Sequence, residues 1–401
     1  MVEVRPATPE ELPEMARQAS QQLGLPEEMF GGMNPAWTLC AFEDGELATT
    51  YAAWPLQIRF NGPPTPIAGV TQVSTHPKFR RRGFLRAITR KHFETLHEDG
   101  GTALAGLHPA WMAIYQRYGY GTVNIRHSYE VEPRNVQFAH PLETPGELRE
   151  IELEDEFGLL VDVYRRFRDD RNGLVHRGKA MWDAGPLDDP PPGHRRTVLV
   201  YEVDGEAQGY VIYSMGPGWQ RNDAGPRLYM VVSDLFALTP QATQALWKAM
   251  GQYDNVAAIQ WDNAPPDDTL PNMLVEPRLL NIKQRDGIMA RFVTMEDAVR
   301  LRPYPETAEL RFELKDDFCE WNAGRWRLDT DPETSDCTRI DGEDVEITLT
   351  PDTLASMMFG RITATDAARA GLLDVHDERA LTRWDRALKT KYLPYEAEHT
   401  W

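Results

Sequence analysis

Cysteine is scarce in this chain of 401 residues, which contains only Cys40, Cys319 and Cys337. Three widely spaced thiols form neither a disulfide framework nor a paired-cysteine metal site. No apolar run approaches the roughly 20 residues that a membrane helix needs. Residues 1–5 also lack the basic-then-apolar pattern of a secretory signal. We therefore expect a cytoplasmic protein with no membrane partner.

Basic residues are also fewer than acidic ones. Forty-three Lys and Arg residues face 62 Asp and Glu residues, which gives a formal net charge of −19. Repulsion of polyanions argues against nucleic acid and anionic membranes as partners, whereas a cationic substrate would be attracted. His76, His92 and His97 do not have the spacing of a metal-ligand set, so no metal is predicted.

Two β-hairpin signals indicate that one structural plan occurs twice. Asp44-Gly45 joins predicted strands at 37–43 and 47–59, and Asp204-Gly205 joins predicted strands at 197–203 and 207–215. In each half a further strand and then a helix follow; these helices are expected at 84–99 and 241–250. We interpret this pattern as a duplicated domain of mixed α/β structure.

The last hundred residues follow a different pattern, with strands first and helices after them. The expected strands are 309–313, 320–328, 336–340 and 345–349, and the expected helices are 351–358 and 364–370. Runs of strands followed by helices are typical of a separate α+β domain.

The most informative segment is Val70–Arg86, in which a strand passes through an arginine-rich loop directly into the helix expected at 84–99. The first-turn amides of a helix lack internal partners and attract anions. Gly83 allows a ligand to approach the backbone, and the three arginines before it can bind phosphate. A solvated basic helix face is the alternative for so short a motif. The corresponding segment 228–241 has neither arginine nor glycine at its turn, so no cofactor is predicted there.

A second segment, Ile114–Gly121, follows one helix and one strand later, and together the two resemble the core of the GNAT N-acetyltransferases. The resemblance implies that the arginine loop holds the pyrophosphate of acetyl-coenzyme A and that Val73–Thr75 binds its pantetheine arm. It also places Tyr115 near the sulfur of the leaving coenzyme A. Leu85 departs from the family pattern, which usually has a small residue, Gly or Ala, at this position. The residues assigned to the cofactor in this way are Val73, Ser74, Thr75, Arg80, Arg81, Arg82, Gly83, Phe84, Leu85, Arg86, Ala110 and Trp111.

Over its whole length the chain resembles the Eis (enhanced intracellular survival) family. That resemblance implies an N-terminal catalytic GNAT domain at 1–130, a degenerate GNAT-like domain at 131–288 and a sterol-carrier-protein-like α+β domain at 289–401. It further implies that the terminal carboxylate of Trp401 acts as the base, with Tyr115 as the acid, and that the protein assembles as a homohexamer. A frayed terminus is the alternative for Trp401.

Three further residues are candidates for the acceptor site. Gln72 and Trp37 are assigned to the acceptor pocket by alignment, and His108 matches a position close to the site in the family. His108 either takes part in the reaction through a water molecule or is a core histidine whose hydrogen bonds are all made within the protein. Ala110 and Trp111 stand where the family commonly has a Ser-Glu-type pair.

The function predicted from the sequence is transfer of acetyl from acetyl-coenzyme A to a primary amine. The expected acceptor is a polycationic small molecule similar to an aminoglycoside, or a lysine side chain, and the acidic chain suits both. The alternative is an apolar-ligand-binding protein in which the acetyltransferase folds are vestigial scaffolds.

Overall fold

The computed structural model describes residues 2–218 and 227–398. The chain forms two compact units. The first contains residues 2–124 and 287–394, and the second contains Ile125–Asp286 together with Tyr395–Glu398. Within the described residues no helix is both long and apolar enough to cross a membrane.

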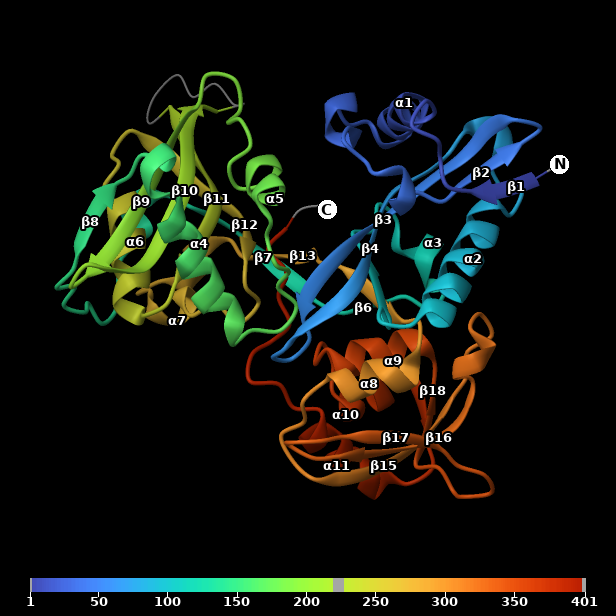
Figure 1. Ribbon diagram of the computed structural model, residues 1–401. Helices are drawn as coiled ribbons and strands as arrows, with labels where there is room; N and C mark the ends of the chain where they lie inside the picture. The colour runs from blue at the N-terminus through green and yellow to red at the C-terminus, as the bar shows by residue number, and fades with distance from the viewer. Residues whose placement is uncertain (1, 219–226, 399–401) are drawn as a thin grey trace. The chain divides into compact units, whose positions relative to one another are not determined.

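The N-terminal part of the first unit is built on a seven-stranded sheet with the order β1-β2-β3-β4-β5-β14-β6. Strands β1 to β4 of this sheet are drawn in blue in Figure 1. Its only parallel pair in the described registers is β4 with β5; the other neighbours are antiparallel. The strands are β1 (Val2–Arg5), β2 (Cys40–Glu43), β3 (Glu46–Arg59), β4 (Pro64–Thr75), β5 (Leu104–Leu107), β6 (Gly121–Thr122) and β14 (Met289–Phe292).

Helices cover both faces of this sheet. On β3 alternate residues face opposite sides, so that Tyr51 packs with α2 (Phe84–Asp99) and Ala52 packs with α1 (Leu12–Leu23). The short elements are η1 (Glu27–Phe30), η2 (Pro35–Trp37), η3 (Pro77–Phe79) and α3 (Met112–Gln116). The sheet is therefore buried on two sides, and β4 leads directly from its centre into η3 and α2.

The C-terminal part of the first unit is a five-stranded sheet with the order β17-β16-β15-β18-β19. On β15, Leu310, Phe312 and Leu314 are buried, and α11 packs against this strand. The strands are β15 (Ala308–Leu314), β16 (Gly324–Thr330), β17 (Asp336–Arg339), β18 (Ile347–Leu349) and β19 (Leu373–Val375). The helices are α8 (Met295–Leu301), α9 (Pro351–Met358), α10 (Ala364–Arg369) and α11 (Glu378–Ala387).

The second unit repeats the plan of the N-terminal sheet, with the order β13-β7-β12-β11-β10-β9-β8. On β10, Tyr210 packs with α4 on one face and Val211 packs with α6 on the other. The strands are β7 (Ile125–Val131), β8 (Glu147–Glu150), β9 (Arg195–Val203), β10 (Glu206–Pro217), β11 (Leu228–Ala237), β12 (Val256–Ala264) and β13 (Lys283–Asp286). The helices are η4 (Pro133–Asn135), α4 (Leu153–Asp169), α5 (Lys179–Ala184), α6 (Pro240–Met250), α7 (Leu270–Met273) and η5 (Pro277–Leu280).

The structure confirms the mixed α/β class, both hairpins and the helix at 84–99. Two expected strands are wrong in part. Residues 37–39 precede β2, because the Asn34 side chain caps a 3₁₀ turn by accepting from the amide of Ala36 at 3.0 Å. Residues 320–322 form η6 (Glu320–Asn322), where the buried Asn322 side chain donates to the carbonyl of Val293 at 3.0 Å.

One half-buried histidine makes the stability of the N-terminal sheet dependent on pH. His92 on α2 lies 2.8 Å from the Tyr51 hydroxyl through Nδ1, and burial lowers its pKa to about 4. The unfolded chain binds a proton at this site near pH 6.5, whereas the folded chain does not. The stability that the neutral ring contributes is therefore present above pH 6.5 and lost as the pH falls toward 4.

We expect wild-type protein to lose more stability than His92→Gln between pH 7 and 4, by at most about 3 kcal/mol. Denaturant unfolding of both proteins across this range measures the difference. The Gln side chain is polar but does not titrate, so it isolates the histidine from the carboxylates. Parallel pH profiles for the two proteins would show that His92 is not responsible.

Candidate active site

The N-terminal sheet separates at the point where the sequence predicted a cofactor. The parallel pairing of β4 with β5 runs from Ile67 to Val70 and includes no later residue of β4. A register shift on β3 between Thr50 and Ala52 coincides with Gln72, whose φ of 52° is left-handed. The Thr50 hydroxyl holds this bulge by donating to the Gln72 carbonyl at 2.6 Å. Val73–Thr75 therefore continues β4 beyond the ladder with β5, and its backbone on that side is available to a ligand.

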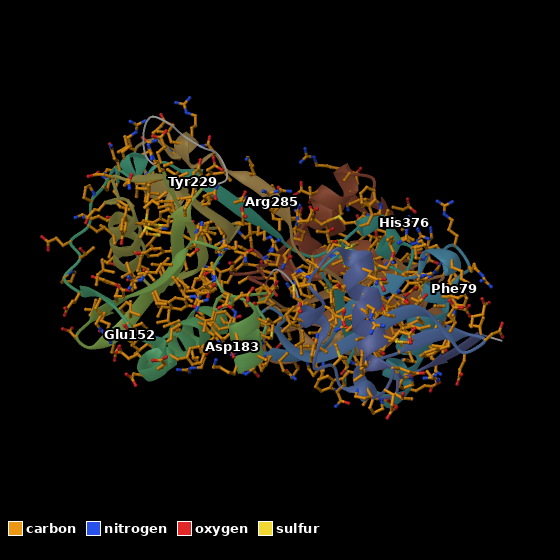
Figure 2. All side chains as sticks on the ribbon, turned by 90° about the horizontal axis from the view of Figure 1, so that it is seen from above. Phe79, Glu152, Asp183, Tyr229, Arg285 and His376 are labelled. Carbon is orange, nitrogen blue, oxygen red and sulfur yellow. The ribbon has the colours of Figure 1, made fainter. Side chains whose placement is uncertain are left out.

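The arginine loop follows immediately after this strand. Phe79, which is labelled in Figure 2, is buried and anchors the turn, while Arg80, Arg81 and Arg82 are exposed. Arg80 donates to the Thr75 carbonyl at 3.2 Å, which ties the loop to the strand. Arg81 has a left-handed φ of 63°, which an arginine rarely adopts without a local requirement. The loop thus has a defined shape and carries three arginines on one turn. Arg82 pairs with Glu43, and Arg80 also donates to the Gln22 side chain at 2.8 Å.

The N-terminus of α2 has the features of an anion site. Gly83 is its N-cap, with a left-handed φ of 85°, and no side chain caps the first turn. A Cβ built on Gly83 would meet no atom within 4 Å, so the space above the helix end is open. Uncapped first-turn amides, a positive helix end and adjacent arginines suit a diphosphate. The residues present therefore fit the pyrophosphate of the cofactor that the sequence predicted.

A group of tyrosines lies in the core behind this turn. Tyr115 on α3 packs with Tyr51, Tyr118 and Tyr120, and its ring lies edge-on to Tyr120 with centroids 6.1 Å apart. Burial raises the pKa of Tyr115 to about 12. No described residue hydrogen-bonds its hydroxyl. Tyr115 is therefore a neutral donor at physiological pH, with its proton free for a ligand.

The acceptor-site candidates are only partly brought together. The buried Gln72 side chain donates to the Phe30 carbonyl at 3.4 Å, and Trp37 packs against Trp54 with ring centroids 5.2 Å apart. Trp54, on β3, was not among the residues predicted from the sequence, because alternation on a strand does not show which residue of another element it contacts. His108 directly follows β5 and is half-buried.

Two predicted cofactor contacts stand at the start of α3. Ala110 is exposed, and Trp111, the N-cap of the helix, has a relative exposure of 67%. Single exposed apolar side chains are common on protein surfaces, so the exposure of Trp111 does not by itself indicate a ligand. Leu85 is half-buried and packs against the core of the N-terminal sheet. Trp401 lies outside the described residues.

The corresponding turn of the second unit differs in chemistry. The Thr239 hydroxyl caps α6 by accepting from the amide of Ala242 at 3.1 Å. A side-chain cap takes up a first-turn amide that would otherwise face a ligand. Together with the missing arginine and glycine, this cap supports the expectation that no cofactor binds there.

A groove of about 680 Å³ lies on the five-stranded sheet of the first unit. Charged and polar side chains line it almost throughout, among them Arg311, Glu313, Lys315 and Arg325. Arg311 and Glu313 alternate on β15 with the buried Leu310 and Phe312, so they face away from the core. The groove is therefore suited to polar ligands and not to a sterol or fatty acid.

Comparison with known proteins agrees with this architecture. Residues 3–123 and 173–301 each match an acetyltransferase (GNAT) domain, and residues 295–396 match a sterol carrier protein domain. An uncharacterised N-acetyltransferase of Streptomyces avermitilis is 30% identical over 339 residues, which cover 83% of this chain and 82% of the relative. The N-acetyltransferase Eis of Mycobacterium tuberculosis is 29% identical over 332 residues, which cover 80% and 78%.

Solved structures share the same fold across the chain. Eis1 from Mycobacterium abscessus aligns with a TM-score of 0.82 at 24% identity, covering 98% of this chain and 99% of that one. A GCN5-related N-acetyltransferase from Anabaena variabilis aligns with a TM-score of 0.86 at 20% identity, covering 99% and 100%. With two GNAT domains, a sterol-carrier domain and relatives that match over most of their length, the chain belongs to the Eis family of GNAT N-acetyltransferases.

Proposed function

We propose that this acetyltransferase moves the acetyl group of acetyl-coenzyme A to a primary amine of a polycationic small molecule similar to an aminoglycoside. A lysine side chain is the second acceptor consistent with the chemistry. The observation that carries the proposal is the open, uncapped N-terminus of α2 beside the three exposed arginines and the freed edge of β4. The net charge of −19 favours the approach of a polycation. Homohexameric assembly and a cytoplasmic location stay predictions from the sequence.

The residues of the N-terminal sheet have distinct roles in this proposal. Val73–Thr75 binds the pantetheine arm through its backbone, and the Arg80–Gly83 turn with the first amides of α2 binds the diphosphate. When bound, the cofactor supplies the activated acetyl group. The amine nitrogen forms a bond to the acetyl carbonyl carbon, the carbon–sulfur bond breaks, and the sulfur leaves as a thiolate beside Tyr115. The proton lost by the nitrogen passes to the terminal carboxylate of Trp401.

Proton energetics limit what the two catalytic groups do. An α-carboxyl has a pKa of about 3.5 and an alkyl ammonium about 10, so direct deprotonation is uphill by roughly 9 kcal/mol. The carboxylate therefore accepts the proton once carbon–nitrogen bond formation has made the nitrogen acidic. With the pKa of Tyr115 raised to about 12, full transfer of its proton to a thiolate near 8.5 costs about 5 kcal/mol. Tyr115 therefore acts by hydrogen-bonding the leaving sulfur.

The alternative function, binding of an apolar ligand by the third domain, gains no support from the groove on its sheet. Arginine, lysine, aspartate and glutamate side chains dominate the lining. An apolar pocket binds an apolar ligand because both surfaces leave contact with water. A charged lining must be desolvated and gives no such gain.

Gly83→Ala tests the anion site. The substitution forces a Cβ into a left-handed position and into the open space at the helix end, so we expect the Kd for acetyl-coenzyme A to rise at least tenfold in a calorimetric titration. Gly101→Ala is the matched control, since Gly101 also has a left-handed φ and open surroundings but lies beyond the other end of α2. Equal affinities in both variants would refute the proposed site.

Tyr115→Phe removes the hydrogen bond to the leaving sulfur. We expect kcat for acetylation of neomycin to fall at least tenfold, or about 1.4 kcal/mol, with the KM for acetyl-coenzyme A nearly unchanged. Tyr120→Phe removes a hydroxyl from the same cluster that has no hydrogen-bond partner among the described residues, and it should leave kcat within twofold. A Tyr115→Phe enzyme as fast as wild type would exclude the assigned role.

Deletion of Trp401 tests the terminal base by moving the carboxylate back by about 3.5 Å. We expect kcat to fall at least tenfold while acetyl-coenzyme A binds with unchanged affinity. A Gly-Ser extension after Trp401 displaces the carboxylate in the other direction and should have the same effect. Full activity in both variants would assign the base to another group.

A further inference from the structure

The turn that follows Tyr115 contains two glycines, and both lie against a more distant part of the same unit. Gly119 has a left-handed φ of 79°, and a Cβ placed on it would lie 2.6 Å from a guanidinium nitrogen of Arg291. A Cβ on Gly121 would overlap the backbone carbonyl of Asp352, on α9 of the sterol-carrier domain. The two glycines therefore permit the close approach of β14 and of the third domain to this turn.

Arg291 holds the turn through a buried ion pair. Its side chain, on β14, is fully buried and donates to the carbonyl of Tyr118. It also pairs with Asp316, whose side chain is 1% exposed and which lies between β15 and η6 in the third domain. Removal of one partner from a buried pair leaves the other charge without compensation. Asp316 therefore keeps the guanidinium of Arg291 neutralised at the place where it binds the Tyr118 carbonyl.

Asp316 also shapes the chain segment that enters the core of the N-terminal sheet. Its Oδ1 accepts from the amides of Phe318 and Cys319, at 3.1 and 2.9 Å. The ring centroids of Phe318 and Tyr118 are 5.2 Å apart, and both rings belong to the same buried cluster as Tyr115. A residue of the third domain thus completes the packing of the tyrosine group.

A further contact comes from α9. The Ser356 hydroxyl donates to the carbonyl of Thr122, on β6, at 2.9 Å, and to that of Asp352, one turn earlier on α9, at 2.8 Å. The turn after Tyr115 is therefore contacted at its start by the Arg291 side chain and at its end by α9.

Tyr115 needs such support because its own helix is too short to fix it. Helix α3 has five residues, and no side chain caps its N-terminus. An isolated helix of this length is not stable in water, so tertiary contacts determine where α3 lies. The amides of Tyr118 and Tyr120 donate to the Tyr115 carbonyl at 2.9 and 3.4 Å. The turn that Arg291 holds is thus bonded directly to the backbone of Tyr115.

We propose that the third domain positions Tyr115, with Asp316 acting through Arg291 and the Tyr118 carbonyl to hold the tyrosine hydroxyl where the sulfur leaves. This inference rests on the proposed role of Tyr115 as the hydrogen-bond donor to that sulfur. A donor stabilises a developing charge only within a narrow range of distance and angle, so a small displacement of α3 lowers kcat. The proposed cofactor contacts lie on β4 and at the N-terminus of α2, so Asp316 and Arg291 are positioning residues.

Asp316→Asn, tested in the full-length protein, removes the charge that neutralises Arg291 and keeps the size of the side chain. We expect kcat for acetylation of neomycin to fall about tenfold, with the Kd for acetyl-coenzyme A within threefold of wild type. An unchanged kcat in the folded variant would overturn the inference.

Glu346→Gln is the matched control, because it makes the same change at another buried carboxylate of the third domain. The Glu346 side chain is 5% exposed, pairs with Arg383 and accepts from the Trp384 indole at 2.9 Å. This variant should be less stable than wild type yet keep kcat within twofold. A fall in kcat as large as that of Asp316→Asn would show that any damage to this domain slows turnover, and the positioning role would be lost.

A double mutant separates positioning from a general loss of structure. In the Tyr115→Phe enzyme the hydroxyl to be positioned is absent, so the addition of Asp316→Asn should slow turnover less than twofold further. Losses in kcat that multiply would contradict the inference, as would a tenfold weaker Kd for acetyl-coenzyme A.

A second variant decides the matter should Asp316→Asn fail to fold. Ser356→Ala removes only the hydroxyl that joins α9 to β6. We expect kcat to fall at least threefold in the otherwise wild-type enzyme and to change less than 1.5-fold when Tyr115→Phe is already present. Equal effects in the two backgrounds, or no effect in either, would exclude positioning by the third domain.

The same variants distinguish this inference from the proposed function. If Tyr115→Phe slows turnover and the third-domain variants do not, the positioning role fails and the role of Tyr115 stands. If Tyr115→Phe has no effect, the role of Tyr115 fails and the positioning role fails with it, whereas the titration of Gly83→Ala still decides the cofactor site.

Discussion

In each of the two large sheets, the hydrogen bonding between two parallel strands stops before the strands end. The rest of the structure depends on this constraint. Each unpaired strand edge carries amides and carbonyls that must find partners. In the first sheet the edge of β4 beyond Val70 leads to an uncapped helix with open space above Gly83. In the second sheet the tail of the chain, Tyr395–Glu398, lies at the corresponding place, next to Asn263. The same fold therefore has the proposed ligand site in one sheet and a segment of its own chain in the other.

The charged residues differ between the two places where a parallel pair of strands separates. The chain as a whole is strongly acidic, yet the turn after β4 exposes three successive arginines, which favour a diphosphate locally. At the second of these places the positive charge is the buried Arg177, already neutralised by Asp234 and Glu398. Because this ion pair is buried, its guanidinium does not face solvent as Arg80, Arg81 and Arg82 do.

The sequence predicted those features that depend on neighbouring residues. The turn at Asp44-Gly45, the helix from Phe84 to Asp99 and the arginine-rich turn are local patterns, and the structure has them all. The position of β14, between β5 and β6 of the first sheet, could not be predicted. It is a strand of four residues that returns after the entire second unit, and nothing local to it specifies that pairing.

The place of the tail was hidden for the same reason. The resemblance to the Eis family assigned the tail to the third domain at 289–401, which it follows in sequence. Only the fold shows that Tyr395 is buried with α4 and that Glu398 meets Arg177 far away in sequence. Residues far apart in sequence therefore hold the tail on the second unit, Tyr395 through its burial and Glu398 through its ion pair with Arg177.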